Sequence, residues 1–248
     1  MRYTTPGGNV YNLFVDALKQ PHLLIAGATG SGKSVIINGL IYTALHDLPG
    51  CQSGGKEFIL IDPKRVELVQ WRDMPHTIRY TSEPAEMVHA LEIAMRITET
   101  RYQQMQRERK RKFPGGNLYV IIDEFADLLL TQKKTVKPMI QRLAQIGRAA
   151  NVHIVLATQT PIAQVLPTEI KCNFDARFGL RTRSAQDSRN IIGCTGCENL
   201  PRYGQAYYMT PGQIQLYNVP FIDDPQLDAM AAYWINQRPI GFFHRRRK

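Results

Sequence analysis

The sequence lacks any uninterrupted apolar run long enough to cross a bilayer as a helix. Its first residues, Met-Arg-Tyr-Thr-Thr-Pro, also lack the apolar centre of a secretory signal peptide. No internal repeat and no low-complexity linker interrupts the chain. These absences predict a protein with no membrane segment of its own and a cytoplasmic location.

Cysteine is scarce, with four residues in a chain of 248. Only Cys194 and Cys197 form a Cys-x-x-Cys pair, and neither a second pair nor a suitably spaced histidine accompanies them. The pattern therefore does not indicate a structural zinc site. Because disulfides are rare in the cytosol, we expect reduced thiols.

Acidic residues are few compared with basic ones. The chain has 21 Asp and Glu against 31 Lys and Arg, which gives a formal net charge of +10. Basic side chains gain affinity for nucleic acid by releasing counterions from its phosphates, so the charge favours a nucleic acid partner. An anionic membrane surface is the second candidate, and charge alone does not choose between them.

What the chain does contain is a phosphate-binding sequence near its start. Residues 27–34 read Gly-Ala-Thr-Gly-Ser-Gly-Lys-Ser, with apolar residues on both sides, as in a loop that joins a buried strand to a helix. Glycines let backbone N–H groups curl around phosphate oxygens, and the helix N-terminus favours negative charge. The pattern predicts ATP binding by Gly27, Thr29, Gly30, Ser31, Gly32, Lys33 and Ser34. Within this set, Lys33 reaches the β- and γ-phosphates, and the Ser34 hydroxyl holds Mg²⁺.

Four apolar runs recur along the chain, at residues 23–26, 58–61, 118–122 and 153–157. They are apolar at successive positions, which is typical of strands that are buried on both faces of a parallel sheet. Residues 84–105 carry apolar side chains at helical spacing and predict a packing helix. We therefore expect an α/β fold, a mainly parallel sheet flanked by helices on both faces. One domain is expected over residues 21–238, after a short lead-in (1–20) and before a basic tail (239–248).

Two basic runs stand out from the rest of the sequence. The first, at the end of the predicted helix, contains Arg107, Arg109, Lys110, Arg111 and Lys112, and the second is the tail His-Arg-Arg-Arg-Lys at residues 244–248. A cationic helix end is usually solvated and is stabilised by the helix dipole. Contact with a polyanion is the alternative for both runs.

The third apolar run leads directly into Asp123 and Glu124. Open α/β sheets bind their ligands at the carboxyl ends of their strands, so this acidic pair is expected beside the phosphate loop. Asp123 would then hold Mg²⁺, and Glu124 would polarise the water that attacks the γ-phosphate. A helix cap is the alternative role for Asp123.

The fourth apolar run delivers Gln159 to the same edge, where a neutral amide can sense the γ-phosphate. Arg148 lies just upstream, at the end of a helix expected after Pro138. This arginine can serve a neighbouring subunit's nucleotide as an arginine finger. An ordinary surface arginine is the equal alternative.

Taken together, these strings resemble the motor domain of the FtsK/SpoIIIE family of DNA translocases. The matching segments are residues 21–34, Ile-Asp-Pro-Lys-Arg-Val-Glu-Leu at 61–68, Asp-Glu-Phe-Ala-Asp-Leu at 123–128, and residues 147–150 followed by 156–159. Further matches occur at residues 187–189, 198–200 and 221–234, so the resemblance covers nearly all of the chain after the lead-in. The membrane helices and the winged-helix module that members usually carry have no counterpart here. We therefore expect neither membrane anchoring nor sequence-directed polarity.

The resemblance implies a RecA-like P-loop NTPase that forms a hexameric ring and threads double-stranded DNA through its pore by hydrolysing ATP. It implies phosphate-loop roles for Lys33 and Ser34, metal-binding and catalytic roles for Asp123 and Glu124, and a sensor role for Gln159. It also makes Arg148 the arginine finger. Segments that match pore regions of the family supply the DNA-contact candidates Lys171, Arg181, Arg183 and Arg189. Ion pairs at the surface or between subunits are the alternative for those four.

Two other functions stay open on the sequence. Related RecA-like ATPases work in conjugation or protein secretion, where they move single-stranded DNA or protein. The chain can also be read as a DNA-binding adaptor that uses nucleotide only as an assembly switch. The Glu124 carboxylate argues against the adaptor, because a switch that does not hydrolyse ATP has no need of it.

Overall fold

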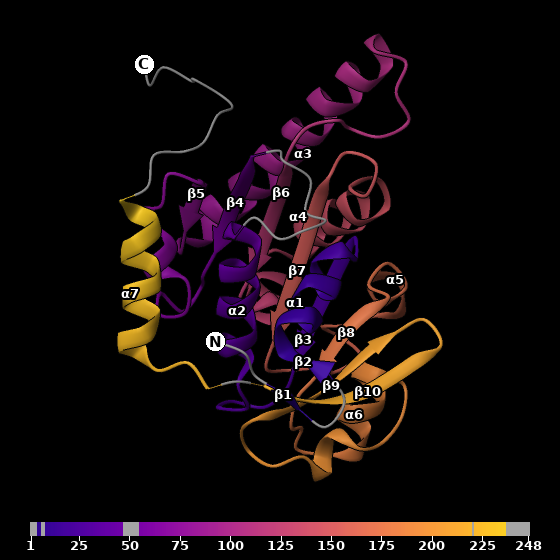
Figure 1. Ribbon diagram of the computed structural model, residues 1–248. Coiled ribbons are helices and arrows are strands. Elements are labelled where there is room, and N and C mark those ends of the chain that lie inside the picture. The colour runs from indigo at the N-terminus through magenta and orange to yellow at the C-terminus, as the bar shows by residue number, and fades with distance from the viewer. Residues whose placement is uncertain (1–3, 6–7, 47–54, 220, 237–248) are drawn as a thin grey trace.

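Eight strands form the central sheet of the protein, which we describe from a computed structural model covering residues 4–5, 8–46, 55–219 and 221–236 (Figure 1). These strands are β3 (His22–Ala26), β4 (Lys56–Ile61), β5 (Thr77–Thr81), β6 (Asn117–Ile122), β7 (Val152–Thr158), β8 (Ala176–Gly179), β9 (Gln205–Thr210) and β10 (Gln213–Asn218). A separate short pair consists of β1 (Thr4–Thr5) and β2 (Gly8–Asn9). All four apolar runs of the sequence are strands, as predicted.

The strand order is β10-β9-β8-β3-β7-β6-β4-β5. The six strands from β8 to β5 run parallel to one another, and β9 and β10 continue the sheet as antiparallel strands. The prediction of a mainly parallel sheet is therefore confirmed. Its consequence is that β3, β6, β7 and β8 all end at the same edge, which we call the carboxyl edge.

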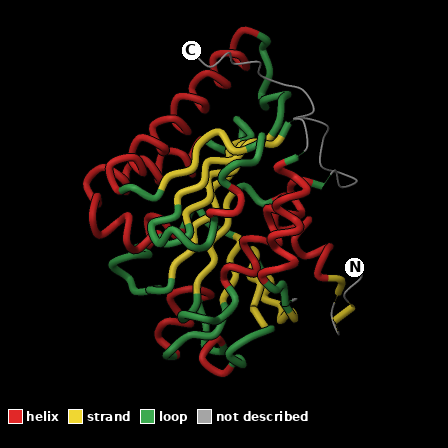
Figure 2. The backbone as a smooth tube through the Cα atoms, turned by 90° about the vertical axis from the view of Figure 1, so that its left-hand side faces the viewer, coloured by secondary structure: helices red, strands yellow, loops and turns green. Residues whose placement is uncertain are grey.

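Helices cover both faces of this sheet, as the edge-on view in Figure 2 shows. One face packs against α1 (Val10–Lys19), α2 (Lys33–Leu45), the short η1 (Val69–Trp71) and α7 (Asp224–Ile235), and the other against α3 (Pro84–Arg107), α4 (Phe125–Ile146) and α5 (Thr168–Lys171). Successive residues of β3 alternate between the two cores: Leu23 and Ile25 enter one, and Leu24 enters the other. This alternation explains why the run is apolar at every position.

The helix α4 differs from the sequence prediction, which began a helix after Pro138. It starts at Phe125, directly after the acidic pair, and continues past Pro138 to Ile146. Its regular backbone is interrupted at Gln132 (φ −132°, ψ 31°), so α4 consists of two helical segments that meet at a kink. The backbone therefore enters α4 directly after the acidic pair at the carboxyl edge.

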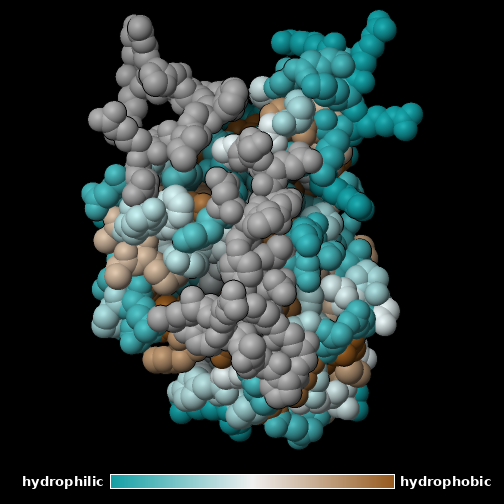
Figure 3. Space-filling model, in the orientation of Figure 1, coloured by the Kyte–Doolittle hydropathy of each residue, from teal (hydrophilic) through white to brown (hydrophobic). Residues whose placement is uncertain are grey.

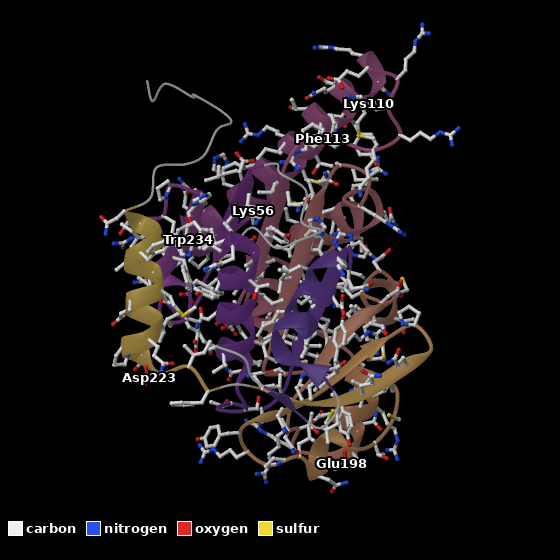
Figure 4. The ribbon with its side chains drawn as sticks, in the orientation of Figure 1. Lys56, Lys110, Phe113, Glu198, Asp223 and Trp234 are labelled. Atoms are coloured by element: carbon white, nitrogen blue, oxygen red, sulfur yellow. The ribbon has the colours of Figure 1, made fainter. Side chains whose placement is uncertain are left out.

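The predicted packing helix is α3, and it ends at Arg107, before the rest of the basic run. Arg109 adopts a left-handed conformation (φ 51°), and the Lys110 N–H donates to the Met105 carbonyl, which closes the helix. The Arg101 guanidinium then lies over the Phe113 ring, and its central carbon is 4.6 Å from the centre of that ring. Figure 4 shows Lys110 and Phe113 at this tip, and Figure 3 shows hydrophilic side chains projecting there. The cations of the run are exposed, as expected for a solvated helix end.

Two further elements complete the carboxyl edge, α6 (Ala185–Ile192) and the short η2 (Cys197–Asn199). Cys172 and Cys194 are exposed free thiols, and Cys197 is a buried one, in which burial raises the pKa to about 11. Cys51 and the basic tail lie outside the described residues. No helix in the described part of the chain is long and apolar enough to span a membrane.

Candidate nucleotide and metal site

The phosphate loop lies at the carboxyl edge, between the end of β3 and the start of α2. The Gly27 N–H donates to the Thr158 carbonyl at the end of β7 (3.3 Å), and the Ala28 N–H donates to the Arg181 carbonyl just after β8 (2.7 Å). A Cβ on Gly27 would lie 2.8 Å from both Leu180 Cβ and Ser31 Oγ, so only glycine fits. The two neighbouring strands therefore hold the loop in position.

Lys33 is the first residue of α2 and points back into its own loop. Its Nζ donates to the carbonyls of Gly27 (2.9 Å) and Ala28 (3.0 Å), and the side chain is almost fully buried. Burial lowers the pKa of Lys33 to about 8, against the opposing effect of Glu124 and Asp123. The hydroxyl of Ser31 is also buried and has no hydrogen-bond partner among the described residues. Both groups are hydrogen-bond donors, and phosphate oxygens are suitable acceptors for them in a phosphate-binding loop.

Asp123 follows β6 and is only 3 % exposed. Burial, together with the carboxylates of Glu67 and Asp62, raises its pKa to about 7. Such an excess of buried negative charge suits a divalent cation, and oxygen atoms are the ligands that Mg²⁺ prefers. The described residues hold no cluster of three or more His, Cys, Asp or Glu side chains arranged for a metal. Asp123 and the Ser34 hydroxyl are thus the protein's candidate ligands, with phosphate oxygens and water for the remaining positions.

Glu124 is held by hydrogen bonds from three residues. Lys64 Nζ lies 2.9 Å from its Oε2, the Thr158 hydroxyl donates to its Oε1 (2.7 Å), and the Gln159 N–H lies 3.2 Å from both oxygens. The carboxylate is 3 % exposed. Lys64 belongs to the matched segment 61–68, but sequence reasoning gave it no role in the site, because a single lysine after a strand carries no signal of its partner.

Gln159 connects this carboxylate to the phosphate loop. Its side-chain Oε1 accepts a hydrogen bond from the Thr29 hydroxyl (2.7 Å), while its backbone N–H bonds Glu124. Thr29, Gln159, Glu124 and Lys64 thus form one connected chain of polar groups, which we call the Thr29–Lys64 network. The structure brings the predicted sensor and the predicted base together within it.

The four DNA-contact candidates fall into two separate pairs. Arg181 and Arg183 are exposed beside the phosphate loop, where Arg183 lines a small cavity of about 80 Å³ together with Gln159. Lys171 lies at the other end of β8 and donates to the Asn190 carbonyl (3.3 Å), next to Arg189. One of the pairs therefore adjoins the nucleotide site itself.

Arg148 lies at the edge of the sheet opposite the phosphate loop. It is exposed in the turn between α4 and the start of β7. Because β7 has seven residues, this edge is about 20 Å from the carboxyl edge. Arg148 cannot reach the phosphate loop of its own chain, so a role at a nucleotide requires a neighbouring subunit.

Sequence reasoning missed Arg202 and Tyr203, which lie over the phosphate loop. A Cβ on Gly30 would lie 3.4 Å from Arg202 Nη2 and 3.9 Å from Tyr203 Cε1. The Arg202 guanidinium lies over the Tyr203 ring, 5.1 Å from its centre. No motif marks these residues, because they are more than 160 positions away from the loop in sequence.

Comparison with known sequences gives one consistent result. The FtsK/SpoIIIE family model matches residues 7–117 and 114–163. The DNA translocase FtsK of Caulobacter vibrioides is 34 % identical over 94 % of this chain, and that of Rhizobium meliloti is 34 % identical over 92 %. The chain spans about a third of the length of these relatives, 33 % and 30 %.

Solved structures with this fold include a conjugation coupling protein and a secretion ATPase. The pCW3 conjugation coupling protein TcpA, solved with ATPγS, has a TM-score of 0.76 over 94 % of this chain and 69 % of its own, at 20 % identity. The cytoplasmic domain of the type VII secretion ATPase EccC from Thermomonospora curvata has a TM-score of 0.72 over 89 % of this chain and 28 % of its own, at 20 % identity. At this identity the likeness concerns the fold alone, a mainly parallel sheet flanked by helices on both faces, as expected.

Proposed function

The chain belongs to the FtsK/SpoIIIE family, and we propose that it is the ATP-hydrolysing motor of a DNA translocase, moving double-stranded DNA through a ring of identical subunits. One observation carries the hydrolytic part of the proposal. The Thr29–Lys64 network links the phosphate loop to a buried glutamate at the carboxyl edge. A protein that only bound nucleotide would not need a carboxylate oriented in this way.

The residues of the site divide the work of hydrolysis. ATP would lie in the loop of residues 27–34, where Lys33 exchanges its bonds with the Gly27 and Ala28 carbonyls for phosphate oxygens. Mg²⁺, held by Ser34 and Asp123, would neutralise charge on the phosphates. Glu124 would orient and polarise the attacking water, and Gln159 would exchange its Thr29 contact for the γ-phosphate or that water.

Double-stranded DNA is proposed as the substrate that is moved. The relatives named DNA translocase support it, and so does the net charge of +10. Arg181, Arg183, Arg189 and Lys171 are the proposed contacts. Since Arg183 shares a cavity with Gln159, a phosphate backbone held by this arginine would lie close to the γ-phosphate sensor. That proximity offers a direct route by which DNA binding can influence hydrolysis.

Steady-state ATPase activity, with and without long duplex DNA, tests the proposal. We expect strong stimulation by duplex, weaker stimulation by single-stranded DNA, and loss of the effect as salt rises. Glu124→Gln should bind ATP yet hydrolyse none, whereas Lys33→Ala should not bind it. Parental turnover by Glu124→Gln would contradict the assignment of the base.

The outcome of the same assay separates the alternatives. A steady rate of ATP hydrolysis that neither duplex nor single-stranded DNA changes would favour an ATPase of a secretion apparatus. Stimulation by single-stranded DNA alone would favour an ATPase of a conjugation apparatus. Tight ATP binding without turnover would favour the nucleotide-switched adaptor. Assembly into a hexamer is a further part of the proposal, which sedimentation in the presence of ATP and DNA tests independently.

A further inference from the structure

We propose that Arg202 is a second phosphate-binding cation of the nucleotide site, supplied by the same chain and held in place by Tyr203. This inference rests on the proposed function, because it concerns the same site. Arg202 lies outside every motif that predicted ATP binding, in the loop that joins η2 to β9. It would contact the phosphate chain from the side opposite Lys33.

The position of Arg202 is the first support. Gly30 has a positive φ of 71° and no side chain, and a Cβ built there would meet Arg202 Nη2 at 3.4 Å and Nε at 3.7 Å. The guanidinium therefore lies directly over the outer turn of the phosphate loop. A loop that presents N–H groups to phosphates also presents those phosphates to any cation at its rim.

The charge of Arg202 is the second support. Lys33, the cation that starts α2, already bonds two backbone carbonyls of the loop. Arg202 stays charged throughout the physiological range. It is exposed, and within the described residues no carboxylate pairs with it. In the part of the chain that the structure describes, its guanidinium contacts the aromatic face of Tyr203, so its hydrogen-bond donors are available to a ligand.

The setting of the loop is the third support, because a phosphate-binding arginine needs a fixed position. Leu200 is buried in the small core around α6, and the Val219 N–H donates to the Gly204 carbonyl (2.8 Å). These contacts tie both ends of the short segment that carries Arg202 and Tyr203. Figure 4 labels Glu198 of η2 at the end of the molecule where this segment begins. The Arg202 guanidinium then lies over the Tyr203 ring in a cation–π contact.

The test is direct binding of ATPγS and of adenosine, measured by calorimetry on Arg202→Ala, Arg202→Lys and the parental chain. A charge-assisted contact predicts that Arg202→Ala weakens ATPγS binding by about ten- to a hundredfold. The affinity for adenosine, which has no phosphate, should not change. Arg202→Lys should recover part of the loss. Tyr203→Phe should bind like the parent, since the ring remains, and Tyr203→Ala should show an intermediate loss.

Controls separate this proposal from the proposed function. Arg142→Ala removes an exposed arginine of α4 and should leave both affinities unchanged. If Lys33→Ala abolishes ATPγS binding while Arg202→Ala binds like the parent, the role of Arg202 is refuted and the nucleotide site stands. If Arg202→Ala instead weakens only the anisotropy-measured affinity for duplex DNA, the arginine serves DNA phosphates and the proposal fails. A parental chain that binds no ATPγS overturns both proposals.

Discussion

At the scale of single residues, the site is a dense arrangement of opposite charges in which Lys33, Asp123 and Glu124 are buried. Asp62, Glu67, Asp123 and Glu124 supply four carboxylates, and Lys33 and Lys64 supply the cations that act on them. The balance between these negative and positive charges decides which of the carboxyl groups are protonated, because buried charges interact far more strongly than charges in water. Two substitutions test this balance from opposite sides.

Lys64→Met should lower the turnover number about tenfold and leave ATP affinity unchanged. The lysine bonds Glu124 at 2.9 Å and also lowers the pKa of Asp123, so its loss misorients the proposed base and favours protonation of the proposed metal ligand. The acid limb of the pH–rate profile should therefore move to higher pH. Lys64→Arg, which keeps the charge, is the matched control. A basal rate above that of the parent would mean that the lysine restrains Glu124.

Asp123→Asn should make the metal-free protein more stable at pH 8. The pKa of Asp123 is about 7 in the folded chain against 3.8 for the free side chain. At pH values between these two, the folded state therefore binds one proton that the unfolded state has lost. The stability that this group contributes is therefore present below about pH 4 and is lost as the pH rises through 7. Asparagine stays neutral, which predicts a gain of about 2–4 kcal/mol at pH 8 and almost none at pH 4.

Urea unfolding across this pH range measures the effect. Asp127→Asn, at an exposed position of α4, is the control and should change stability little at any pH. An Asp123→Asn variant that is no more stable than the parent at pH 8 would show that the buried carboxylate carries no such cost. Adding Mg²⁺ should stabilise the parent and narrow the difference.

At the scale of elements, the contact between α1 and α2 positions the helix that starts at the phosphate loop. Gly39 of α2 faces Phe14 of α1, and a Cβ there would lie 2.5 Å from the Phe14 ring. Phe14 belongs to the core on this face of the sheet, and Gly39 is a buried residue of α2 beside it. The glycine thus permits a close approach of two helices, at the expense of helix propensity.

Gly39→Ala should destabilise the protein by about 1–2 kcal/mol, although alanine favours helices by about 1 kcal/mol. The added methyl group collides with the ring, and the core leaves little room for it to move. In a Phe14→Leu background the same substitution should become stabilising. A double-mutant cycle from urea unfolding gives the coupling, and an equal effect of Gly39→Ala in both backgrounds would show that the ring yields freely.

The sequence predicted β3, β4, β6 and β7, four of the six parallel strands, because each of them carries apolar residues at successive positions. It missed the parallel strands β5 and β8, which are short and carry polar residues. It did not predict β9 and β10, where apolar and polar residues mix and every residue of β10 but Tyr217 is exposed. The helix α4 was predicted too late because Pro138 was taken as its start, whereas the backbone turns at Gln132. Local propensity cannot reveal where tertiary packing carries a helix past a proline.

The site was predictable where a motif prescribes its chemistry and not elsewhere. The strand ends predicted that the phosphate loop, Asp123, Glu124 and Gln159 would share one edge, and the structure brings them there. Lys64 and Arg202 were missed because their roles arise from contacts between distant segments. Their partners in the site lie 60 and more than 160 residues away. Such pairs become visible only once the chain is folded.

At the scale of the whole molecule, mixing subunits tests the role of Arg148. The arginine is at the edge opposite the phosphate loop, so a variant lacking it should damage the neighbour's site and leave its own intact. Adding Arg148→Ala subunits to parental ones should lower ATPase activity more steeply than the parental fraction. Arg142→Ala subunits, changed at an exposed arginine within α4, should not. Strict proportionality for Arg148→Ala would count against action between subunits.

The separation of Arg148 from the phosphate loop also has an arithmetic consequence for assembly. If each catalytic centre takes its loop from one chain and its arginine from the next, the contact is head-to-tail, and a row of n open-ended subunits holds n − 1 complete centres. Closing the row adds one centre without adding a subunit. The rate of ATP hydrolysis per subunit would then report ring closure. This rate would increase gradually as rows lengthen and would reach its maximum only when the ring is closed.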